Sequence, residues 1–228
     1  KAILEGGSVY GIPGKLFELN CQIFLVPMVD PDGVDLVTGG IPVGSLQWEK
    51  ARSLADNYPN IPFPDGWKAN LLGVDLNLQY PAGWLQAREI KFSQGYTRPG
   101  PRDYVGRAPL AQRESRALAD FTEYLDPALI LAYHTQGELI YWKYDDIRVE
   151  GAQALGEEFA RLSGYSLEDT PYASGFAGYK DWFIKTWHRP GFTIEAGLGE
   201  NPLPISQFDS IYAKNLGILT TAALGLPE

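Results

Sequence analysis

The sequence predicts an α/β fold in which strands alternate with helices and long loops build the functional site. Short apolar runs typical of buried strands occur at residues 21–29, 128–134 and 192–195. Segments with apolar residues at helical spacing separate the later runs. Long segments rich in glycine, proline and aspartate join the elements, and loops of that length in a compact domain usually serve a function.

The composition is that of a globular protein. The chain has 228 residues, of which 45% are hydrophobic and 13% aromatic, enough for one sizeable core. The net charge of −9 argues against nucleic acid as a partner. No run of 18 or more apolar residues occurs, so no membrane span is predicted.

The single cysteine and the first residues bear on redox chemistry and domain boundaries. Cys21 lies in an apolar run and is expected to be a buried, unreactive thiol. The lack of disulfides fits both the cytosol and many bacterial secreted enzymes. Residues 1–7 resemble the last turn of a helix followed by the glycines that end it. We therefore expect residues 1–228 to be a single domain that lacks its N-terminal part.

In the first half of the chain, two segments are expected to be strands and the rest irregular. Residues 21–29 are typical of a central strand, and the Asp-Pro-Asp-Gly sequence at 30–33 predicts a turn. A long loop is expected at 38–70. A short strand at 74–76 precedes a second irregular stretch at 81–105.

In the second half, helices and strands alternate more regularly. The expected helices have apolar residues at helical spacing and cover residues 110–125, 151–162, 181–187 and 205–224. The expected strands are apolar runs at residues 128–134, 138–142 and 192–195.

Two ionisable residues stand at the ends of expected strands. His134 ends the run 128–134 and Glu195 ends the run 192–195. Catalytic groups collect at strand ends in open α/β sheets, and a carboxylate that ends an apolar strand is costly unless it is paired or used. The pair suggests a metal ligand and a general base, although a lone histidine is more often a hydrogen-bonded core residue.

Three further residues are candidates or are set aside. Asn77 follows the short strand at 74–76, close to where that strand ends. Tyr172 lies in a glycine-bracketed stretch that is expected to be flexible, so it either covers a substrate or is an ordinary surface aromatic. His188 lies beside Arg189 and Pro190 in an expected loop and is interpreted as solvated.

Five segments resemble, in order, successive blocks of the zinc carboxypeptidase family. They are residues 26–33 (VPMVDPDG), 73–77 (GVDLN), 131–134 (LAYH), 172–182 (YASGFAGYKDW) and 192–197 (FTIEAG). Each block is weak alone, but their order and spacing over nearly the whole chain are specific. The resemblance implies a mixed, mainly parallel eight-stranded sheet flanked by helices.

The resemblance also implies a catalytic zinc ion. His134 matches the third zinc ligand of the family, and Glu195 matches the general base. The other two ligands come from a His-x-x-Glu motif that this chain does not contain. Catalytic zinc needs three protein ligands and an open position, so we expect the two further ligands upstream of Lys1 and expect residues 1–228 alone to be inactive.

The substrate-binding positions of the family match four residues of this chain. Asn77 matches a contact to the substrate carboxylate, and Tyr172 matches the mobile tyrosine that covers the substrate. Lys68 lies near the position of the oxyanion-stabilising arginine. Lys180 falls about where the family sets its S1′ side-chain preference.

One departure from the family pattern bears on the substrate. Leu78 stands where true carboxypeptidases have an arginine that binds the free C-terminal carboxylate with its bidentate fork. Residues 77–81 (NLQYP) instead resemble the bacterial branch that cleaves γ-D-glutamyl–diamino acid bonds in peptidoglycan stem peptides. Diaminopimelate carries an extra carboxylate, and we expect Lys180 to meet it.

The sequence therefore predicts a zinc-dependent hydrolase of peptidoglycan stem peptides. Two alternatives remain open: a true metallocarboxypeptidase acting on ordinary peptides, and a non-catalytic relative that binds cell-wall peptides. A cell-wall substrate favours a secreted bacterial protein over a cytoplasmic one.

Overall fold

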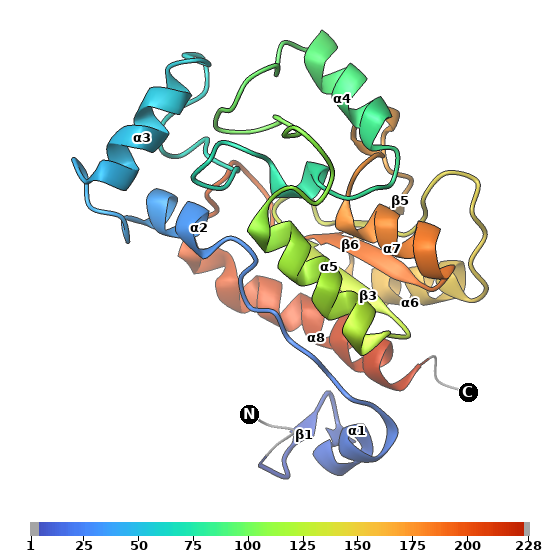
Figure 1. Ribbon diagram of the computed structural model, residues 1–228. Coiled ribbons are helices and arrows are strands. Elements are labelled where there is room, and N and C mark those ends of the chain that lie inside the picture. The colour runs from blue at the N-terminus through green and yellow to red at the C-terminus, as the bar shows by residue number, and fades with distance from the viewer. Residues whose placement is uncertain (1–4, 226–228) are drawn as a thin grey trace. The chain divides into compact units, whose positions relative to one another are not determined.

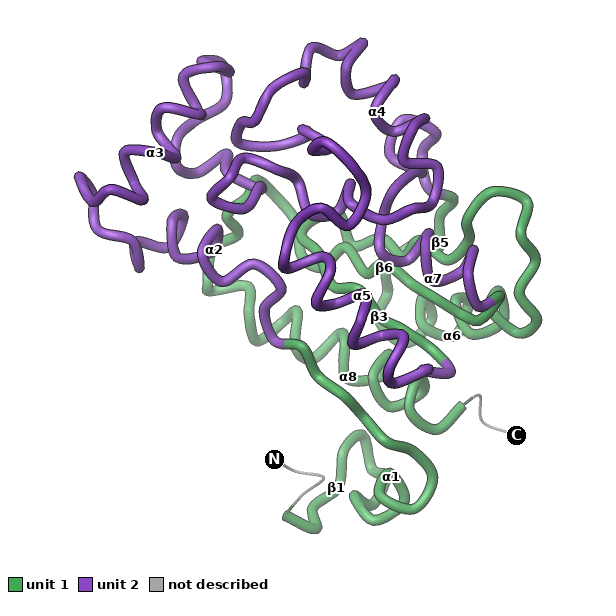
Figure 2. The backbone as a smooth tube through the Cα atoms, in the orientation of Figure 1, with its two compact units in different colours: residues 1–26, 129–169, 188–228 green, residues 27–128, 170–187 purple. Residues whose placement is uncertain are grey.

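The computed structural model describes residues 5–225, which form two compact units (Figure 1, Figure 2). Unit 1 comprises residues 1–26, 129–169 and 188–228, and unit 2 comprises residues 27–128 and 170–187. The expectation of a single domain stays a prediction. The expectation that its N-terminal part is missing depends partly on Lys1–Leu4, which lie outside the described residues.

Unit 1 is built around a four-stranded mixed sheet. The strands are β3 (Ile130–His134), β4 (Leu139–Tyr141), β5 (Ser166–Glu168) and β6 (Gly191–Glu195), in the order β3-β6-β4-β5. The pairs β3–β6 and β4–β5 are parallel, whereas β4–β6 is antiparallel. The two central strands, β6 and β4, therefore run in opposite directions.

Helices α6 (Ala152–Ser163) and α8 (Phe208–Leu224) provide the core that packs on one face of this sheet. Phe192 and Ile194 of β6 are fully buried with Phe159 of α6 and Ile218 of α8. A side chain at Gly217 would come within 2.9 Å of the Leu162 Cβ atom, so the glycine permits the close approach of the two helices.

The remaining elements of unit 1 lie outside the sheet. A short hairpin, β1 (Ser8–Val9) and β2 (Ile12–Pro13), precedes α1 (Gly14–Asn20). The 3-10 helix η3 (Ile205–Gln207) leads into α8. The thiol of Cys21 is only partly buried and donates to the Phe17 carbonyl at 3.2 Å, so the expected full burial of this residue is wrong.

All regular elements among the described residues of unit 2 are helices. Its elements are α2 (Pro31–Thr38), α3 (Leu46–Ala55), η1 (Leu76–Leu78), α4 (Trp84–Ser93), α5 (Arg113–Leu125), η2 (Tyr172–Ser174) and α7 (Tyr179–Trp187). One core cluster joins α2 and α3 to Trp67 and Ala69. A second joins Leu78 and Ala87 to Val105 and Ala177.

The fold expectation holds in its coarse form and fails in its strand count. The chain has an α/β fold with helices and a mixed sheet, but the described residues contain a four-stranded sheet and a two-stranded hairpin, not eight strands. Residues 21–29 have no strand partner and expose several apolar side chains, among them Leu25 at 77%. Residues 74–76 lead into η1. A strand requires a neighbouring strand for its backbone hydrogen bonds, and hydrophobicity alone does not supply one.

Three segments expected to be irregular contain helices. Asp30 is the N-cap of α2 and accepts from the Gly33 amide at 3.1 Å, where a turn was predicted. Ser45 caps α3 in the same way. Helix α4 buries only Ala87, so its apolar pattern is too weak to identify it. Among the described residues, no helix combines the length and hydrophobicity needed to cross a membrane.

Candidate active site

His134 and Glu195 end two neighbouring parallel strands and are register partners. Residues paired across a sheet point to the same face, and successive residues point to opposite faces. Because Ile194 belongs to the core under α6 and α8, Glu195 and its partner His134 point to the other face. Both residues are half-buried. An imidazole and a carboxylate therefore share one edge and one face of the sheet.

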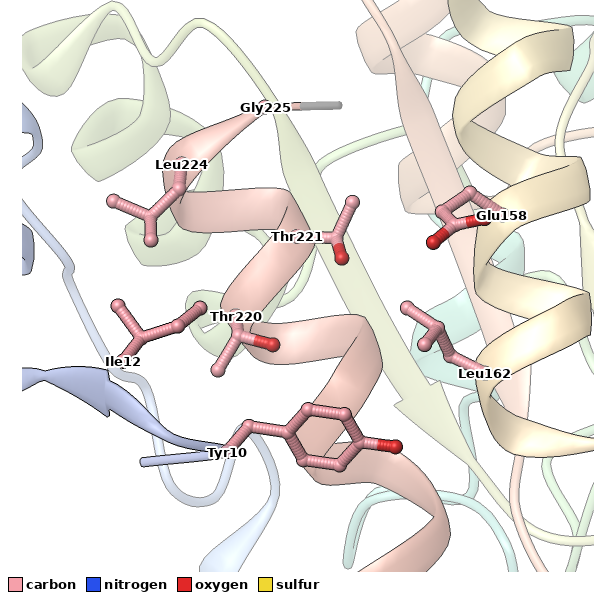
Figure 3. A pocket seen from close by; sticks show the side chains of 8 residues that line it. All are labelled: Tyr10, Ile12, Glu158, Leu162, Thr220, Thr221, Leu224 and Gly225. Carbon is pink, nitrogen blue, oxygen red and sulfur yellow. The ribbon is translucent and has the colours of Figure 1, made fainter. Parts of the chain in front are cut away.

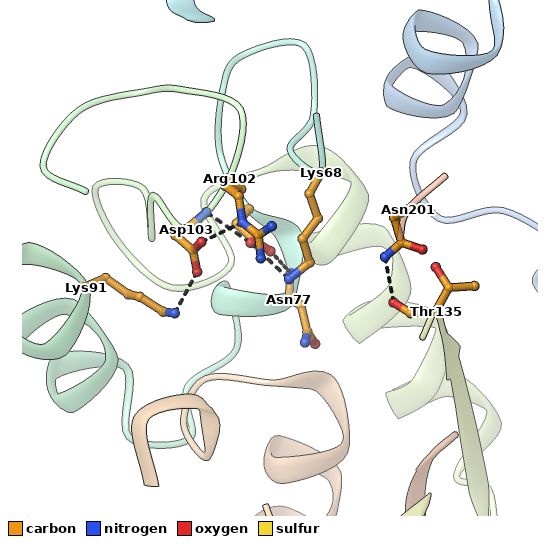
Figure 4. A network of polar contacts seen from close by, with 8 residues as sticks. Lys68, Asn77, Lys91, Arg102, Asp103, Thr135 and Asn201 are labelled. Atoms are coloured by element: carbon orange, nitrogen blue, oxygen red, sulfur yellow. Dashed lines mark hydrogen bonds and ion pairs between the residues drawn. The ribbon is translucent and has the colours of Figure 1, made fainter. Parts of the chain in front are cut away.

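The loops that follow these strands are tied together by hydrogen bonds. The Ala196 amide donates to the His134 carbonyl at 2.8 Å, and the Gly137 amide donates to the Gly197 carbonyl at 2.8 Å. The Asn201 side chain donates to the Thr135 carbonyl at 3.1 Å (Figure 4). These contacts hold the backbone at positions 134 and 195 in place, and such support is what a catalytic pair needs.

Tyr141 adds a phenol to the same face. On β4, Leu139 pairs with Glu195 and Tyr141 pairs with Thr193, so Tyr141 and Glu195 share a side of the sheet. Burial raises the pKa of Tyr141, and the nearby carboxylates of Glu195 and Glu168 add to that shift. Tyr141 is not among the residues predicted from sequence, although its place two residues after Leu139 on an expected strand puts it on that face.

The described residues do not complete a zinc site. They contain no group of three or more histidine, cysteine, aspartate or glutamate side chains able to hold a metal ion. His134 is a suitable donor, but zinc in a catalytic site takes three protein ligands. His134 alone therefore cannot hold a catalytic zinc ion.

In unit 2, the residues around Asn77 form a polar network (Figure 4). Asp75 is buried and accepts from the amides of Asn77 and Asp103, each at 3.1 Å. Its Oδ2 atom lies 3.3 Å from the Lys68 ammonium. The Asp75 carboxylate is the main cause that raises the pKa of Lys68 above its ordinary value, so Lys68 is a cation at neutral pH.

The same network extends to Asp103 through two further cations. Asp103 Oδ1 lies 2.6 Å from the Lys91 ammonium, and Oδ2 accepts from Arg102 Nε at 2.8 Å. Burial opposes ionisation of Asp103, but the hydrogen bonds from Lys91 and Arg102 outweigh it and lower the pKa of this carboxyl. Arg102 is not among the residues predicted from sequence, because nothing in the local pattern connects residue 102 to residue 77.

Gln79 fixes the segment that carries Asn77. It is fully buried, and its Nε2 donates to the carbonyls of Val105 and Ala108. Its Oε1 accepts from the amides of Ala111 at 3.0 Å and Gln112 at 3.2 Å. One side chain therefore satisfies four backbone groups of the 105–112 segment.

Replacing Gln79 with leucine is expected to destabilise the protein by about 3 kcal/mol. The change leaves several buried backbone groups without partners, and each costs roughly 1–3 kcal/mol before relaxation. Urea unfolding measures the loss. Gln86→Leu, at an exposed position on α4, is the control and should change stability by no more than about 0.5 kcal/mol. Equal effects of the two substitutions would contradict the anchoring role.

The other two predicted substrate-binding residues lie in different surroundings. Tyr172 is 75% exposed and packs edge-to-face on Phe176, with ring centroids 5.1 Å apart. Lys180 is 4% exposed, and its ammonium lies 2.6 Å from Asp181 Oδ1. Their roles toward substrate stay predictions. The pairing with Asp181 means that Lys180 already has a buried counter-ion.

Unit 1 contains a pocket (Figure 3), and two of the elements that line it, α6 and α8, pack on the sheet face opposite to His134 and Glu195. Its lining comes from the hairpin, α6 and α8: Tyr10, Ile12, Glu158, Leu162, Thr220, Thr221, Leu224 and Gly225. The Thr220 hydroxyl donates to backbone carbonyls of its own helix, and Glu158 is paired with Arg161. Nothing in this lining resembles a hydrolytic site.

Comparison with known proteins identifies the family. The family model described as zinc carboxypeptidase matches residues 15–216. This chain belongs to the zinc carboxypeptidase family. The resemblance inferred from the five sequence blocks is thereby confirmed, and the family is one of metallopeptidases.

The curated relatives of this family member are bacterial. The chain is 50% identical over 205 residues to gamma-D-glutamyl-L-diamino acid endopeptidase 1 of Lysinibacillus sphaericus, a match that covers 90% of this chain and 49% of the relative. It is 41% identical over 210 residues to the uncharacterized protein YqgT of Bacillus subtilis (strain 168), which covers 92% of this chain and 54% of that protein. The chain thus spans about half the length of the curated relatives it matches.

Solved structures show the same fold. Carboxypeptidase A from Helicoverpa armigera superposes with a TM-score of 0.61 at 18% identity, over 89% of this chain and 52% of that one. Thrombin activatable fibrinolysis inhibitor (TAFI) superposes with a TM-score of 0.51 at 17% identity, over 67% of this chain and 43% of that one. At these identities the likeness concerns the fold alone.

Proposed function

We propose that this protein hydrolyses the γ-D-glutamyl–diamino acid bond of peptidoglycan stem peptides. The observation that carries a hydrolytic function is the pairing of His134 with Glu195 on one face of the sheet. The substrate class rests on the 50% identity to a gamma-D-glutamyl-L-diamino acid endopeptidase. A wall substrate also favours a secreted protein.

In the proposed reaction, Glu195 accepts a proton from the attacking water and passes it to the leaving amine. Lys68, a cation beside Asp75, stabilises the developing oxyanion. Tyr172 covers the substrate and helps to exclude water. A zinc ion, if bound, would polarise the scissile carbonyl and activate water. We propose that His134 would be one of its ligands.

The test is hydrolysis of the tripeptide L-alanyl-γ-D-glutamyl-meso-diaminopimelate by the whole purified protein rather than by residues 1–228 alone. We expect release of free diaminopimelate, loss of activity on treatment with a chelator, and recovery on addition of Zn²⁺. The matched control is a tripeptide whose glutamate is linked through its α-carboxyl group. Mass spectrometry of the products identifies the bond that is cut.

Each alternative predicts a different outcome of this experiment. Equal or faster hydrolysis of the α-linked control would favour a true carboxypeptidase acting on ordinary peptides. Binding of the tripeptide by the zinc-supplemented protein, without any product, would favour a non-catalytic binder. Either result would remove the proposed function.

A further inference from the structure

The position after Asn77 contains no group able to bind a carboxylate. Leu78 is 7% exposed, and its side chain packs with Ala87, Val105 and Ala177 in a core cluster of unit 2. The residue therefore points into the protein interior. If a cation binds a substrate carboxylate near Asn77, it must come from another segment of the chain.

The ion pairs around Asn77 expose their cations more than their carboxylates. Three cations, Lys68, Lys91 and Arg102, surround two carboxylates, Asp75 and Asp103. The carboxylate side chains are 1% and 10% exposed, whereas the side chains of Lys68 and Arg102 are each 45% exposed. The negative charges are thus buried and the accessible edge of the network is cationic, which attracts an anion.

Arg102 has the geometry to bind that anion. Its hydrogen bond to Asp103 uses Nε, which holds the guanidinium in place, and the side chain is 45% exposed. A guanidinium presents its N–H groups as a planar fork that matches a carboxylate. Arg102 is close enough to Lys68 to act on it electrostatically, and Figure 4 shows both side chains directed toward the segment of Asn77.

We propose that Arg102 binds the substrate carboxylate next to the scissile bond, on the carbon that carries the leaving nitrogen. Arg102 thereby supplies from another segment the cation that position 78 lacks, and it sets a preference for stem peptides that end at the diamino acid. The inference rests on the proposed function and names the residue that binds one of the two carboxylates of the diamino acid.

The test compares three substrates. The first is the γ-linked tripeptide. The second is the same tripeptide with the diaminopimelate carboxyl group next to the scissile bond amidated, and the third has lysine in place of diaminopimelate. We expect the wild-type protein to prefer the free carboxylate over the amide. Arg102→Gln should raise KM for the free carboxylate about ten- to hundredfold and leave kcat/KM for the amide nearly unchanged. Arg102→Lys should retain part of the preference.

The control is Arg107→Gln, an exposed arginine on the same segment, which should keep the wild-type preference. An Arg102→Gln protein that still prefers the free carboxylate would overturn the proposal. So would a loss of selectivity only against the lysine substrate, because that loss would assign Arg102 to the distal carboxylate. The amide substrate also reports folding, since a misfolded variant would lose activity on it.

Failure of the proposed function is separable from failure of this inference. If the wild-type protein hydrolyses none of the three substrates, the proposed function is wrong. Calorimetric binding of the free tripeptide and its amide to the wild-type and Arg102→Gln proteins then decides the role of Arg102. Equal affinities of the wild-type and Arg102→Gln proteins for the free tripeptide would overturn the proposed role of Arg102.

Discussion

Replacing Glu195 with glutamine is expected to lower kcat for the γ-linked tripeptide by about a thousandfold or more. General acid–base catalysis raises the rate by a factor of roughly 10²–10⁴, and the glutamine amide also misdirects the attacking water. Glutamine has nearly the same shape as glutamate, so the strand pairing of β6 with β3 should persist. KM should change little because Glu195 acts on the reacting water and not on the bound substrate. Steady-state kinetics with the tripeptide measure both quantities.

Two measurements separate loss of the base from loss of structure. Glu200→Gln changes an exposed carboxylate five residues further along the chain and should retain wild-type activity. Zinc content should be the same in the Glu195→Gln protein as in the wild type, because Glu195 is predicted to act as a base and not as a ligand. Activity within tenfold of wild type in the Glu195→Gln protein would remove this residue from the mechanism.

The ends of β3 and β6 could be predicted from sequence because the apolar residues of each strand indicate that it is buried. Both strands are short runs of apolar residues that end at an ionisable group, and both occur as strands within two residues of the expected bounds. The same rule failed for residues 21–29, which are equally apolar. Pairing is a property of two segments, and the composition of one segment does not reveal whether a partner lies beside it.

Some residues of the candidate site could likewise be predicted from sequence, and others could not. His134 and Glu195 could be identified as candidates from their place at strand ends, and Asn77 from a block of residues that resembles the family. Arg102 could not, because its relation to Asn77 depends on a backbone path through Asp103 and on hydrogen bonds between residues 28 positions apart. Lys180 was assigned from its place in a block, but its contact with Asp181 depends on side-chain packing.

Replacing Phe192 with alanine is expected to destabilise the protein by about 3–5 kcal/mol, the usual cost of truncating a buried aromatic residue. Phe192 is fully buried on β6, and its ring lies 4.9 Å from that of Phe159 in an edge-to-face contact. The cavity would form directly between α6 and the strand that carries Glu195. Urea unfolding should show a lower midpoint, whereas the slope m of the unfolding free energy against urea concentration should be unchanged.

A double-mutant cycle tests whether the two rings stabilise each other. Phe159→Ala combined with Phe192→Ala should cost less than the sum of the single changes, by roughly 0.5–1.5 kcal/mol, since the second truncation removes a contact that is already lost. Phe208→Ala, at a ring that is 57% exposed on α8, is the control and should cost under about 1 kcal/mol. Strict additivity of the first two substitutions would mean that the rings contribute through burial alone. A loss at Phe192 no larger than at Phe208 would place Phe192 outside the core that supports Glu195.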